Sequence, residues 1–117
     1  MAERMYYLAG PMSGQPDHNF PAFDAAAKLL RSRKYLVTSP AELARELPGE
    51  PGSLNYEVYL RMAIQQLLYC TDIIMLPGWE QSRGARLEWE IADKLKFRMW
   101  LYSDGEMRRI PHGDSRA

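Results

Sequence analysis

Cysteine is nearly absent from this chain, which has only Cys70 among its 117 residues. One cysteine cannot form an internal disulfide. Because Cys70 lies in an apolar run without metal-ligand spacing, we expect a small buried hydrophobic residue there rather than a nucleophile. Apolar runs of membrane-spanning length are also missing, as is a recognisable signal peptide. These absences favour a reduced, cytoplasmic protein that does not act at a membrane.

Net charge is absent as well, because 15 Lys and Arg residues balance 15 Asp and Glu residues. Such a chain produces no broad field that would attract a nucleic acid polymer. The two histidines, His18 and His112, lie in different polar segments, so we expect no metal centre and no other cofactor. A length of 117 residues suffices for one domain with a single core.

Strand and helix patterns alternate along the chain. Short apolar runs predict strands at 5–9, 35–38, 73–76 and 97–102. Segments with helical spacing lie between them, and such alternation is typical of parallel strands joined by right-handed crossovers. The sequence therefore predicts an α/β fold, a small doubly wound parallel sheet of four or five strands with helices on both faces. We assign residues 1–103 to this domain and residues 104–117, which are polar and without periodicity, to a C-terminal tail.

Four helices are predicted from apolar spacing and capping residues. Asn19 is a candidate cap for the first, and Ser39 with Glu42 forms a capping-box pattern before a short helix at 40–46. A third helix starts near Asn55 and a fourth near Gly84. The expected core-facing residues are Phe20, Phe23, Ala26, Ala27 and Leu30 in the first, Tyr56, Tyr59, Leu60, Ala63, Ile64, Leu67 and Leu68 in the third, and Leu87, Ile91 and Leu95 in the fourth. Residues 48–53, rich in Pro and Gly, predict a surface loop and a candidate lid.

The segment from Ser82 to Glu88 follows the buried strand at 73–76 and begins the fourth helix. Ligands of open α/β sheets bind at the carboxyl ends of strands and the amino ends of the following helices. Glu88 lies about one turn into the helix, where the helix dipole favours the ionised form. The pattern by itself has two interpretations, a functional carboxylate or an ordinary stabilising residue of a helix start.

The turn after the first strand is a second candidate site. Gly10 and Gly14 allow backbone N–H groups to approach a ligand closely, and Ser13 adds a hydroxyl, an arrangement that suits a phosphate or a sugar. The turn matches neither a P-loop nor a dinucleotide-binding fingerprint. Gly-Pro and Ser-Gly also mark ordinary turns, so ligand binding and a plain turn are equally open on the residues alone.

Two motifs carry a family resemblance. The first is Tyr7-Leu8-Ala9-Gly10 at the end of the first strand, and the second is Ser82-x-Gly84-x-x-x-Glu88-x-x-x-Ala92 after the third. In this order they resemble the nucleoside 2-deoxyribosyltransferase family, including its relatives that hydrolyse nucleoside 5′-monophosphates and its short members from bacteriophages and prophages. The resemblance covers residues 5–102. It implies a flavodoxin-like fold and the cleavage or exchange of an N-glycosidic bond between a base and a ribose or deoxyribose.

The resemblance also implies roles for individual residues. Glu88 falls on the nucleophile, which forms a glycosyl-enzyme at C1′ that water or a second base resolves with net retention. Ser82 matches a contact to the 5′-phosphate, and Ser13 and Gly14 fall in the phosphate-side loop, which favours a nucleotide over a free nucleoside. No cofactor is required. The other candidate substrate-binding residues are Tyr7, Gly10, Pro11, Asn19, Phe20, Trp79, Arg83 and Gly84.

Two kinds of side chain near this site have open alternatives. Arg83 and Arg86 flank the helix start, and each is either a phosphate ligand or a solvated surface charge. Trp79 either stacks on a base and covers the pocket, or packs against the protein or a neighbouring subunit.

One position departs from the family pattern. Well-studied members carry a second carboxylate eight residues ahead of the Asp that opens the third strand. Because Asp72 matches that strand opener, to which we assign a structural role, the place is Ile64 here. Either a carboxylate comes from elsewhere, from Glu57, Glu80 or a partner subunit, or turnover is weak or absent.

Three functions are therefore compatible with the sequence: an N-glycosidase or deoxyribosyltransferase-like enzyme, a non-catalytic nucleotide-binding or sensing module, and a scaffold that works through protein contacts. The partner of the first two is a small nucleoside or nucleotide, and that of the third is a protein. The resemblance and the content of seven Tyr and three Trp residues, which is high for one small domain, lead us to expect a homo-oligomer, a dimer or larger.

Overall fold

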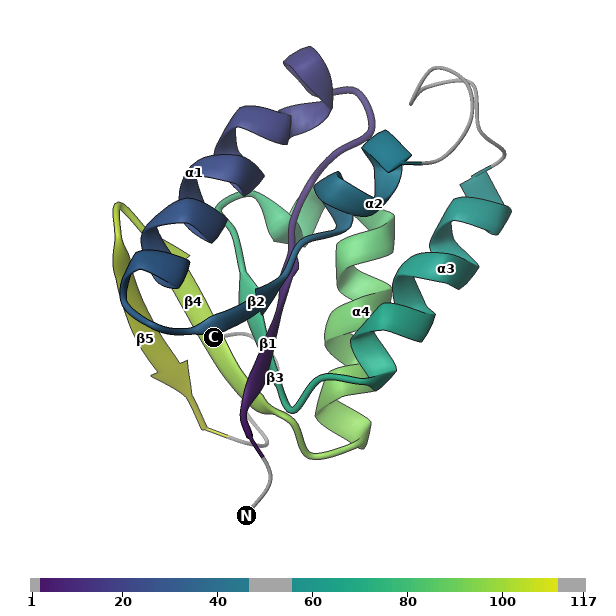
Figure 1. Cartoon of the computed structure of the whole chain (residues 1–117). Helices are drawn as coiled ribbons and strands as arrows, with labels where there is room; N and C mark the ends of the chain where they lie inside the picture. The colour runs from purple at the N-terminus through teal and green to yellow at the C-terminus, as the bar shows by residue number, and fades with distance from the viewer. Residues whose placement is uncertain (1–2, 47–55, 112–117) are drawn as a thin grey trace.

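The computed structural model describes residues 3–46 and 56–111. Its centre is a five-stranded sheet in the order β2-β1-β3-β4-β5 (Figure 1). Strands β1 to β4 are parallel, and β5 pairs antiparallel with β4. Their bounds are β1 Met5–Ala9, β2 Leu36–Thr38, β3 Asp72–Met75, β4 Arg98–Ser103 and β5 Glu106–Ile110. This strand order is that of a flavodoxin-like doubly wound sheet, so the predicted fold class is confirmed.

Helices cover both faces of the sheet. On one face lie α1 (Phe20–Ser32) and α2 (Pro40–Glu46), and on the other lie α3 (Tyr56–Leu68) and α4 (Arg83–Lys94). Two short 3₁₀ helices, η1 (Pro16–Asn19) and η3 (Trp79–Gln81), follow β1 and β3. Because α3 and α4 both return the chain to the start of a parallel strand, they run side by side in the same direction, with their amino ends on the same side of the molecule (Figure 1).

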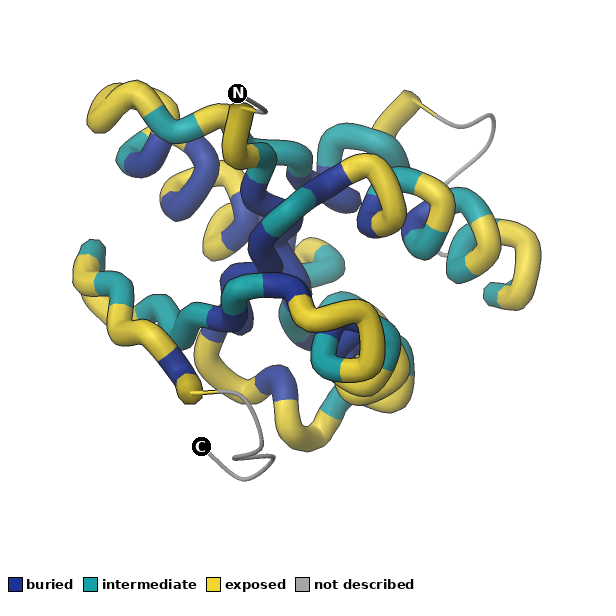
Figure 2. The backbone as a smooth tube through the Cα atoms, turned by 90° about the horizontal axis from the view of Figure 1, so that it is seen from below, coloured by how far each residue is buried: buried dark blue, intermediate teal, exposed yellow. Residues whose placement is uncertain are grey.

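The core consists of two apolar clusters, one on each face of the sheet. Successive residues of a strand point to opposite faces. Accordingly, Tyr7 and Ile73 pack with residues of α3 and α4, whereas Leu8 and Ile74 pack with residues of α1 and α2. The buried backbone is concentrated in the central strands, and exposed residues lie on the outer sides of the helices (Figure 2). The continuous burial of β1 and β3 explains why their sequences lack polar alternation.

The elements predicted from apolar runs are present. The strand at 5–9 and the helix at 40–46 have the predicted bounds, and the other three predicted strands differ by one residue at one or both ends. The apolar stripe of the first helix is buried throughout. Cys70 is a buried free cysteine, as expected.

Part of the predicted C-terminal tail belongs to the sheet instead, because residues 106–110 form β5, which pairs with β4. Ser103 pairs with Glu106 across a two-residue turn, and both turn residues, Asp104 and Gly105, have positive φ angles of 50° and 82°. This is the conformation that an Asp-Gly hairpin turn requires. The Asp-Gly dipeptide was the sequence signal for this hairpin. Because the strand that follows it is half exposed and carries charged residues, it lacks the apolar pattern from which a strand is predicted.

The prediction that Leu68, Leu87 and Leu95 face the core is also wrong. Their exposed fractions are 54%, 39% and 52%. Helix α4 instead buries Ala85, Glu88, Trp89 and Ala92. The side of α4 that faces the sheet therefore carries a carboxyl group, which apolar spacing could not predict.

Two predicted caps form differently from the expectation. Asn19 makes no capping hydrogen bond, and its Nδ2 donates to the Pro11 carbonyl at 2.8 Å. The Ser39 hydroxyl is buried without a hydrogen-bond partner, and the Glu42 carboxylate pairs with Arg31 at 2.6 Å, so the capping-box side-chain bonds are not formed.

Within the described ranges, no helix has the length and apolar character needed to cross a membrane. The candidate lid at 48–53, the proposed helix start at Asn55 and the histidine at 112 lie outside these ranges.

Candidate functional site

A cavity of about 610 Å³ opens at the carboxyl ends of the central strands. The segments that follow β1, β2 and β3 meet there with the amino ends of α3 and α4. This is the edge at which open α/β sheets bind ligands, and the volume is within the range of small-molecule sites. The lining residues are Gly10, Pro11, Met12, Ser13, Gln15, Asn19, Phe23, Pro40, Tyr56, Tyr59, Leu60, Pro77, Gly78, Gln81, Ser82, Arg83, Gly84, Ala85 and Glu88.

Glu88 belongs to the wall of this cavity and is only 6% exposed. The hydroxyl of Tyr7, which is fully buried beneath it, donates a hydrogen bond to Glu88 Oε2 at 2.5 Å. Burial raises the pKa of Glu88 to about 8, and the Tyr7 hydrogen bond acts in the opposite direction. The site therefore holds a carboxyl group that gains or loses its proton near neutral pH.

The expectation that the helix dipole keeps Glu88 ionised is not met. Ser82 is the N-cap of α4, and its Oγ accepts a hydrogen bond from the Ala85 N–H at 3.2 Å. Glu88 lies beyond the first turn that follows this cap. The dipole effect falls off within that turn, so burial dominates the pKa of Glu88.

Gly10 and Gly84 allow protein segments to approach each other. A Cβ atom on Gly10 would lie 2.9 Å from Leu76 Cβ, and one on Gly84 would lie 3.2 Å from the Tyr56 hydroxyl. Gly10 thus brings the end of β1 against the residue that follows β3, and Gly84 brings α4 against α3. Both glycines shape the cavity through packing within the protein.

The loop after β1 forms one side of the cavity. Ser13 and Asn19 line it, and the bond from Asn19 to the Pro11 carbonyl closes the loop. Asp17, His18 and Asn19 have positive φ angles of 52°, 54° and 59°. Asn, Asp and His adopt this left-handed region more readily than most residues, so the sequence permits this sharp loop.

Most of the predicted site residues lie together. The lining contains Gly10, Pro11, Ser13, Asn19, Ser82, Arg83, Gly84 and Glu88, and Tyr7 contacts Glu88 from below. Gly14 and Phe20 are not among the lining residues. Phe20 is buried in the cluster on the α1 side of the sheet, with the Arg45 guanidinium 5.1 Å from its ring centroid.

Trp79 packs within the protein and is not in the lining. It is 5% exposed, and its ring is stacked on that of Trp89 with centroids 4.6 Å apart. Trp79 and Arg86 border a second cavity of about 550 Å³ that Glu80, Trp89, Glu90, Asp93 and Lys94 also line. The packing interpretation of Trp79 is therefore correct, and of the two arginines only Arg83 lines the Glu88 cavity.

Tyr56, Tyr59 and Gln81 also line the cavity, although the sequence pattern did not indicate them as site residues. The two tyrosines were assigned to the core stripe of the third helix because apolar spacing treats a tyrosine as hydrophobic. Both are only half-buried. Two tyrosines at the amino end of a helix could have indicated the cavity, because a half-buried tyrosine places its hydroxyl toward a polar environment.

No second carboxylate joins Glu88 in the lining among the residues that the structure describes. Glu57 is exposed on α3, and Glu80 borders the second cavity. Ile64, at the position where the resemblance implies a carboxylate, is half-buried on α3. Over the same part of the chain, no cluster of three or more His, Cys, Asp or Glu residues could bind a metal ion.

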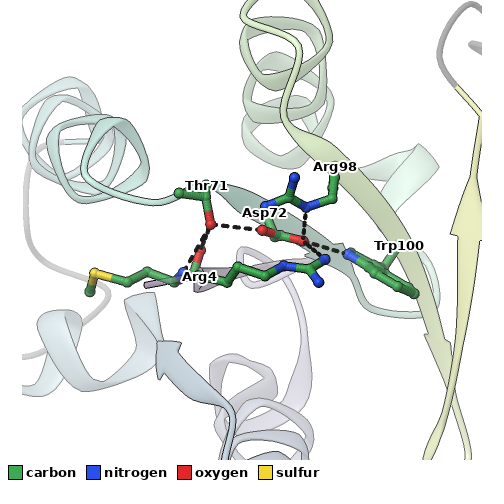
Figure 3. A network of polar contacts seen from close by, with 6 residues as sticks. Arg4, Thr71, Asp72, Arg98 and Trp100 are labelled. Carbon is green, nitrogen blue, oxygen red and sulfur yellow. Dashed lines mark hydrogen bonds and ion pairs between the residues drawn. The ribbon is translucent and has the colours of Figure 1, made fainter. Parts of the chain in front are cut away.

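Asp72 lies at the opposite edge of the sheet, where β3 begins. Its buried carboxylate accepts hydrogen bonds from Arg4, Thr71, Arg98 and Trp100 at 3.0, 2.7, 3.3 and 2.9 Å (Figure 3). These bonds join the start of β3 to β4 and to the segment before β1. Although burial acts to raise the pKa of Asp72, the hydrogen bonds from Arg4, Trp100 and Thr71 lower it overall. The contacts are those of a structural carboxylate.

The strand order, with a cavity at the carboxyl ends of the parallel strands, defines a flavodoxin-like α/β protein, and a solved structure shows more narrowly a nucleoside deoxyribosyltransferase-like fold. A solved structure of the 2-deoxyribosyltransferase from the psychrotolerant bacterium Bacillus psychrosaccharolyticus matches with a TM-score of 0.63 and 18% sequence identity, over 83% of this chain and 70% of that one. That enzyme is described as a biocatalyst for the synthesis of antiviral and antitumoral nucleosides.

The chain belongs to the family described as Domain of unknown function (DUF4406), whose model matches residues 4–101. No curated protein matches the chain significantly. The family match spans β1, β2, β3, most of β4 and both motifs that carried the resemblance.

Proposed function

We propose that this protein cleaves the N-glycosidic bond of a nucleoside or deoxynucleoside, or of its 5′-monophosphate, with Glu88 as the nucleophile. The observation that carries the proposal is the buried Glu88 carboxyl, held by Tyr7 in the wall of a cavity at the carboxyl ends of the strands. The deoxyribosyltransferase-like fold supports the choice of substrate class. The near absence of cysteine favours the cytoplasm as the place of this activity.

The proposed reaction has two steps. Glu88 in its carboxylate form attacks C1′, a C1′–O bond forms, the C1′–N bond breaks, and the base departs with the electron pair and takes up a proton. Water then attacks C1′, releases a proton and breaks the ester, which returns the Glu88 carboxylate and a free sugar. A second base in place of water gives a new nucleoside. Both outcomes need the ionised form of Glu88 in the first step.

The phosphate of a 5′-monophosphate would lie against Ser13, Ser82 and Arg83. All three line the same cavity as Glu88. The Ser82 oxygen accepts a bond from a backbone N–H, which leaves its proton free to be donated. The Arg83 guanidinium lies over the Tyr56 ring, 5.5 Å from its centroid, and supplies positive charge at this end of the cavity.

A non-catalytic nucleotide-binding or sensing module is the second candidate. It is favoured by one observation, the absence of a second carboxylate among the described lining residues. A group with a pKa of about 8 is also largely protonated at neutral pH, which weakens it as a nucleophile. In this case the protein would bind a nucleotide and leave it intact.

The two candidates differ in what is released. Native protein incubated with deoxynucleosides, nucleosides and their 5′-monophosphates should release free base, detected by chromatography, whereas Glu88→Ala should release none. Release should rise about tenfold per pH unit below pH 8 and level off above it, because only the carboxylate attacks. Glu57→Ala, which removes an exposed carboxylate outside the cavity, is the matched control and should retain activity.

Equal release by Glu88→Ala and native protein would falsify the enzyme proposal. Calorimetric binding of a monophosphate that is recovered unchanged would instead establish the binding module.

We also propose that the chain forms a homo-oligomer through the outer side of α3 and α4. Three leucines on these helices or directly after them are exposed, and we call them the α3–α4 strip: Leu68, Leu87 and Leu95, at 54%, 39% and 52%. Each helix also has an exposed acid four residues before an exposed base, Glu57 before Arg61 and Glu90 before Lys94. If the twofold axis is perpendicular to the helices, the helices of two copies run antiparallel, so acids of one copy can face bases of the other.

A further inference from the structure

Breaking an N-glycosidic bond places negative charge on the departing base, and enzymes usually supply an acid or a hydrogen-bond donor to stabilise it. In the described lining, Glu88 is the sole carboxylate, and in the proposed reaction it must be ionised and bonded to C1′. Glu88 therefore cannot serve the base in the same step. A hydrogen-bond donor to the base must therefore be a group other than Glu88, and the side chains of the cavity wall are the candidates considered first.

Tyr59 has the geometry of such a donor. It lies on α3 and lines the cavity together with Glu88. Its hydroxyl donates to Met12 Sδ at 3.4 Å. A thioether sulfur is a weak acceptor, so the hydroxyl can exchange this contact for a nitrogen or oxygen of a bound base at little loss.

The hydroxyl of Tyr7 is engaged in a different way. It donates to Glu88 Oε2 at 2.5 Å, a short bond to an acceptor that carries charge when ionised. Tyr7 therefore serves the nucleophile. Asn19 is engaged too, since its Nδ2 donates to the Pro11 carbonyl.

Tyr59 is also close enough to Glu88 to be influenced by its charge. Burial and then the negative charge of Glu88 raise the pKa of Tyr59 above its usual value. A phenol with a raised pKa stays protonated over the working pH range, so it remains a donor when Glu88 is ionised. It stabilises the base by hydrogen bonding, and the proton that the base takes up comes from water.

We propose that Tyr59 is the hydrogen-bond donor to the departing base. This inference rests on the proposed glycosidic cleavage. It assigns the base to the part of the cavity near Tyr59, and the phosphate to the part near Ser13, Ser82 and Arg83. C1′ then lies between them, beside Glu88.

The experiment compares Tyr59→Phe with native protein on two substrate pairs that share a sugar. One pair is 2′-deoxyguanosine and its 7-methyl derivative, and the other is 2′-deoxyuridine and its 5-fluoro derivative, each tested with and without a 5′-phosphate. In each pair the second base departs more readily and needs less help from a donor. Tyr59→Phe should lower kcat by roughly 10- to 100-fold on the ordinary substrate and by much less on the activated one.

Tyr56→Phe is the matched control, because it removes a second phenol from the same cavity wall and should change both members of a pair equally. Equal loss on both members by Tyr59→Phe, or no loss on either, overturns the assignment of Tyr59. Absence of base release by native protein on all substrates overturns the proposed function itself, which is a separate outcome.

Removal of the hydroxyl also removes the contact to Met12, so melting curves should confirm that Tyr59→Phe folds. As a second variant, 3-fluorotyrosine incorporated at position 59 keeps the shape and makes the phenol a stronger donor. It should raise kcat on the ordinary substrates, and a rate at or below that of native protein contradicts the proposal.

Discussion

At the residue scale, the Glu88 carboxyl is subject to two opposing influences. Burial at 6% exposure disfavours its charge, and the Tyr7 hydroxyl favours it. The four ion pairs of the described chain involve Asp72, Glu42 and Asp24, and none involves Glu88. A buried carboxyl group without a cationic partner lowers the free energy of unfolding. Its presence in a cavity wall is therefore typical of a functional site, where such a cost is retained for the sake of activity.

This arrangement predicts a pH-dependent effect of Glu88→Gln on stability. The pKa of Glu88 is about 8 in the folded protein and 4.5 in a solvated reference. Between these values the unfolded chain loses the proton and the folded chain keeps it, so the free energy of unfolding of native protein falls as pH rises through this window. Glu88→Gln keeps an acceptor for Tyr7 and cannot titrate, so it should not show this fall.

Urea denaturation at several pH values measures the difference. The variant and native protein should be similar near pH 4, and the variant should be more stable by up to about 4 kcal/mol at pH 8.5. Glu57→Gln, an exposed carboxyl on α3, is the control and should follow native protein at every pH. A constant difference between Glu88→Gln and native protein from pH 4 to 8.5 would contradict the raised pKa.

At the element scale, two close approaches between segments give the cavity its walls. Gly10 sets the distance between the end of β1 and Leu76, and Gly84 sets that between α4 and Tyr56 of α3. The two contacts differ in kind. Leu76 Cβ is attached to the backbone next to β3 and cannot move alone, whereas the Tyr56 hydroxyl is the far end of a side chain.

Gly10→Ala is therefore expected to destabilise the fold more than Gly84→Ala. A new Cβ at 2.9 Å from Leu76 Cβ forces strands apart, which costs about 1–3 kcal/mol as other cases of overpacking do. At Gly84 the gain in helix propensity, roughly 1 kcal/mol, offsets the shift of the Tyr56 phenol. The free energies of unfolding in urea should differ in this order, and equal losses for the two variants would show that the β1 contact is not rigid.

At the scale of the whole molecule, the sheet separates a structural edge from a functional one. Asp72 ties β3 to β4 and to the segment before β1 at the amino ends of the strands, and Glu88 lies at their carboxyl ends. The helices α3 and α4 extend between these edges on one face. Their outer side carries the α3–α4 strip, which has exposed leucines that a monomer would leave in water.

The strip predicts self-association that depends on its leucines. Light scattering and sedimentation should give native protein a mass of two or more chains, and Leu87→Asn combined with Leu95→Asn should give one, because polar side chains weaken the burial that stabilises the contact. Leu36→Asn changes a leucine of similar exposure on the edge strand β2 and should leave the mass unchanged. Native protein that sediments as a single chain would refute the proposed interface.

The sequence by itself determined the sheet, because continuous apolar runs bounded by Gly and Pro predict buried parallel strands. It also determined the site motifs: the turn after the first strand and the segment from Ser82 to Glu88 follow neighbouring strands, and parallel strands end at the same edge. The Asp-Gly turn before β5 was likewise present in the sequence. The segment after it was assigned to the tail because its residues are polar.

Only the tertiary structure decided which side of each helix faces inward and which side chains meet. Spacing assigned Leu87 and Leu95 to the core, but α4 is rotated so that Glu88 and Trp89 are buried, which brings Tyr7 into contact with Glu88. Tyr59, which spacing assigned to the core, lines the cavity, and of the two interpretations of Trp79 the structure shows the packed one, stacked on Trp89. These outcomes depend on distances between residues that are far apart in the chain, and local pattern carries no information about such distances.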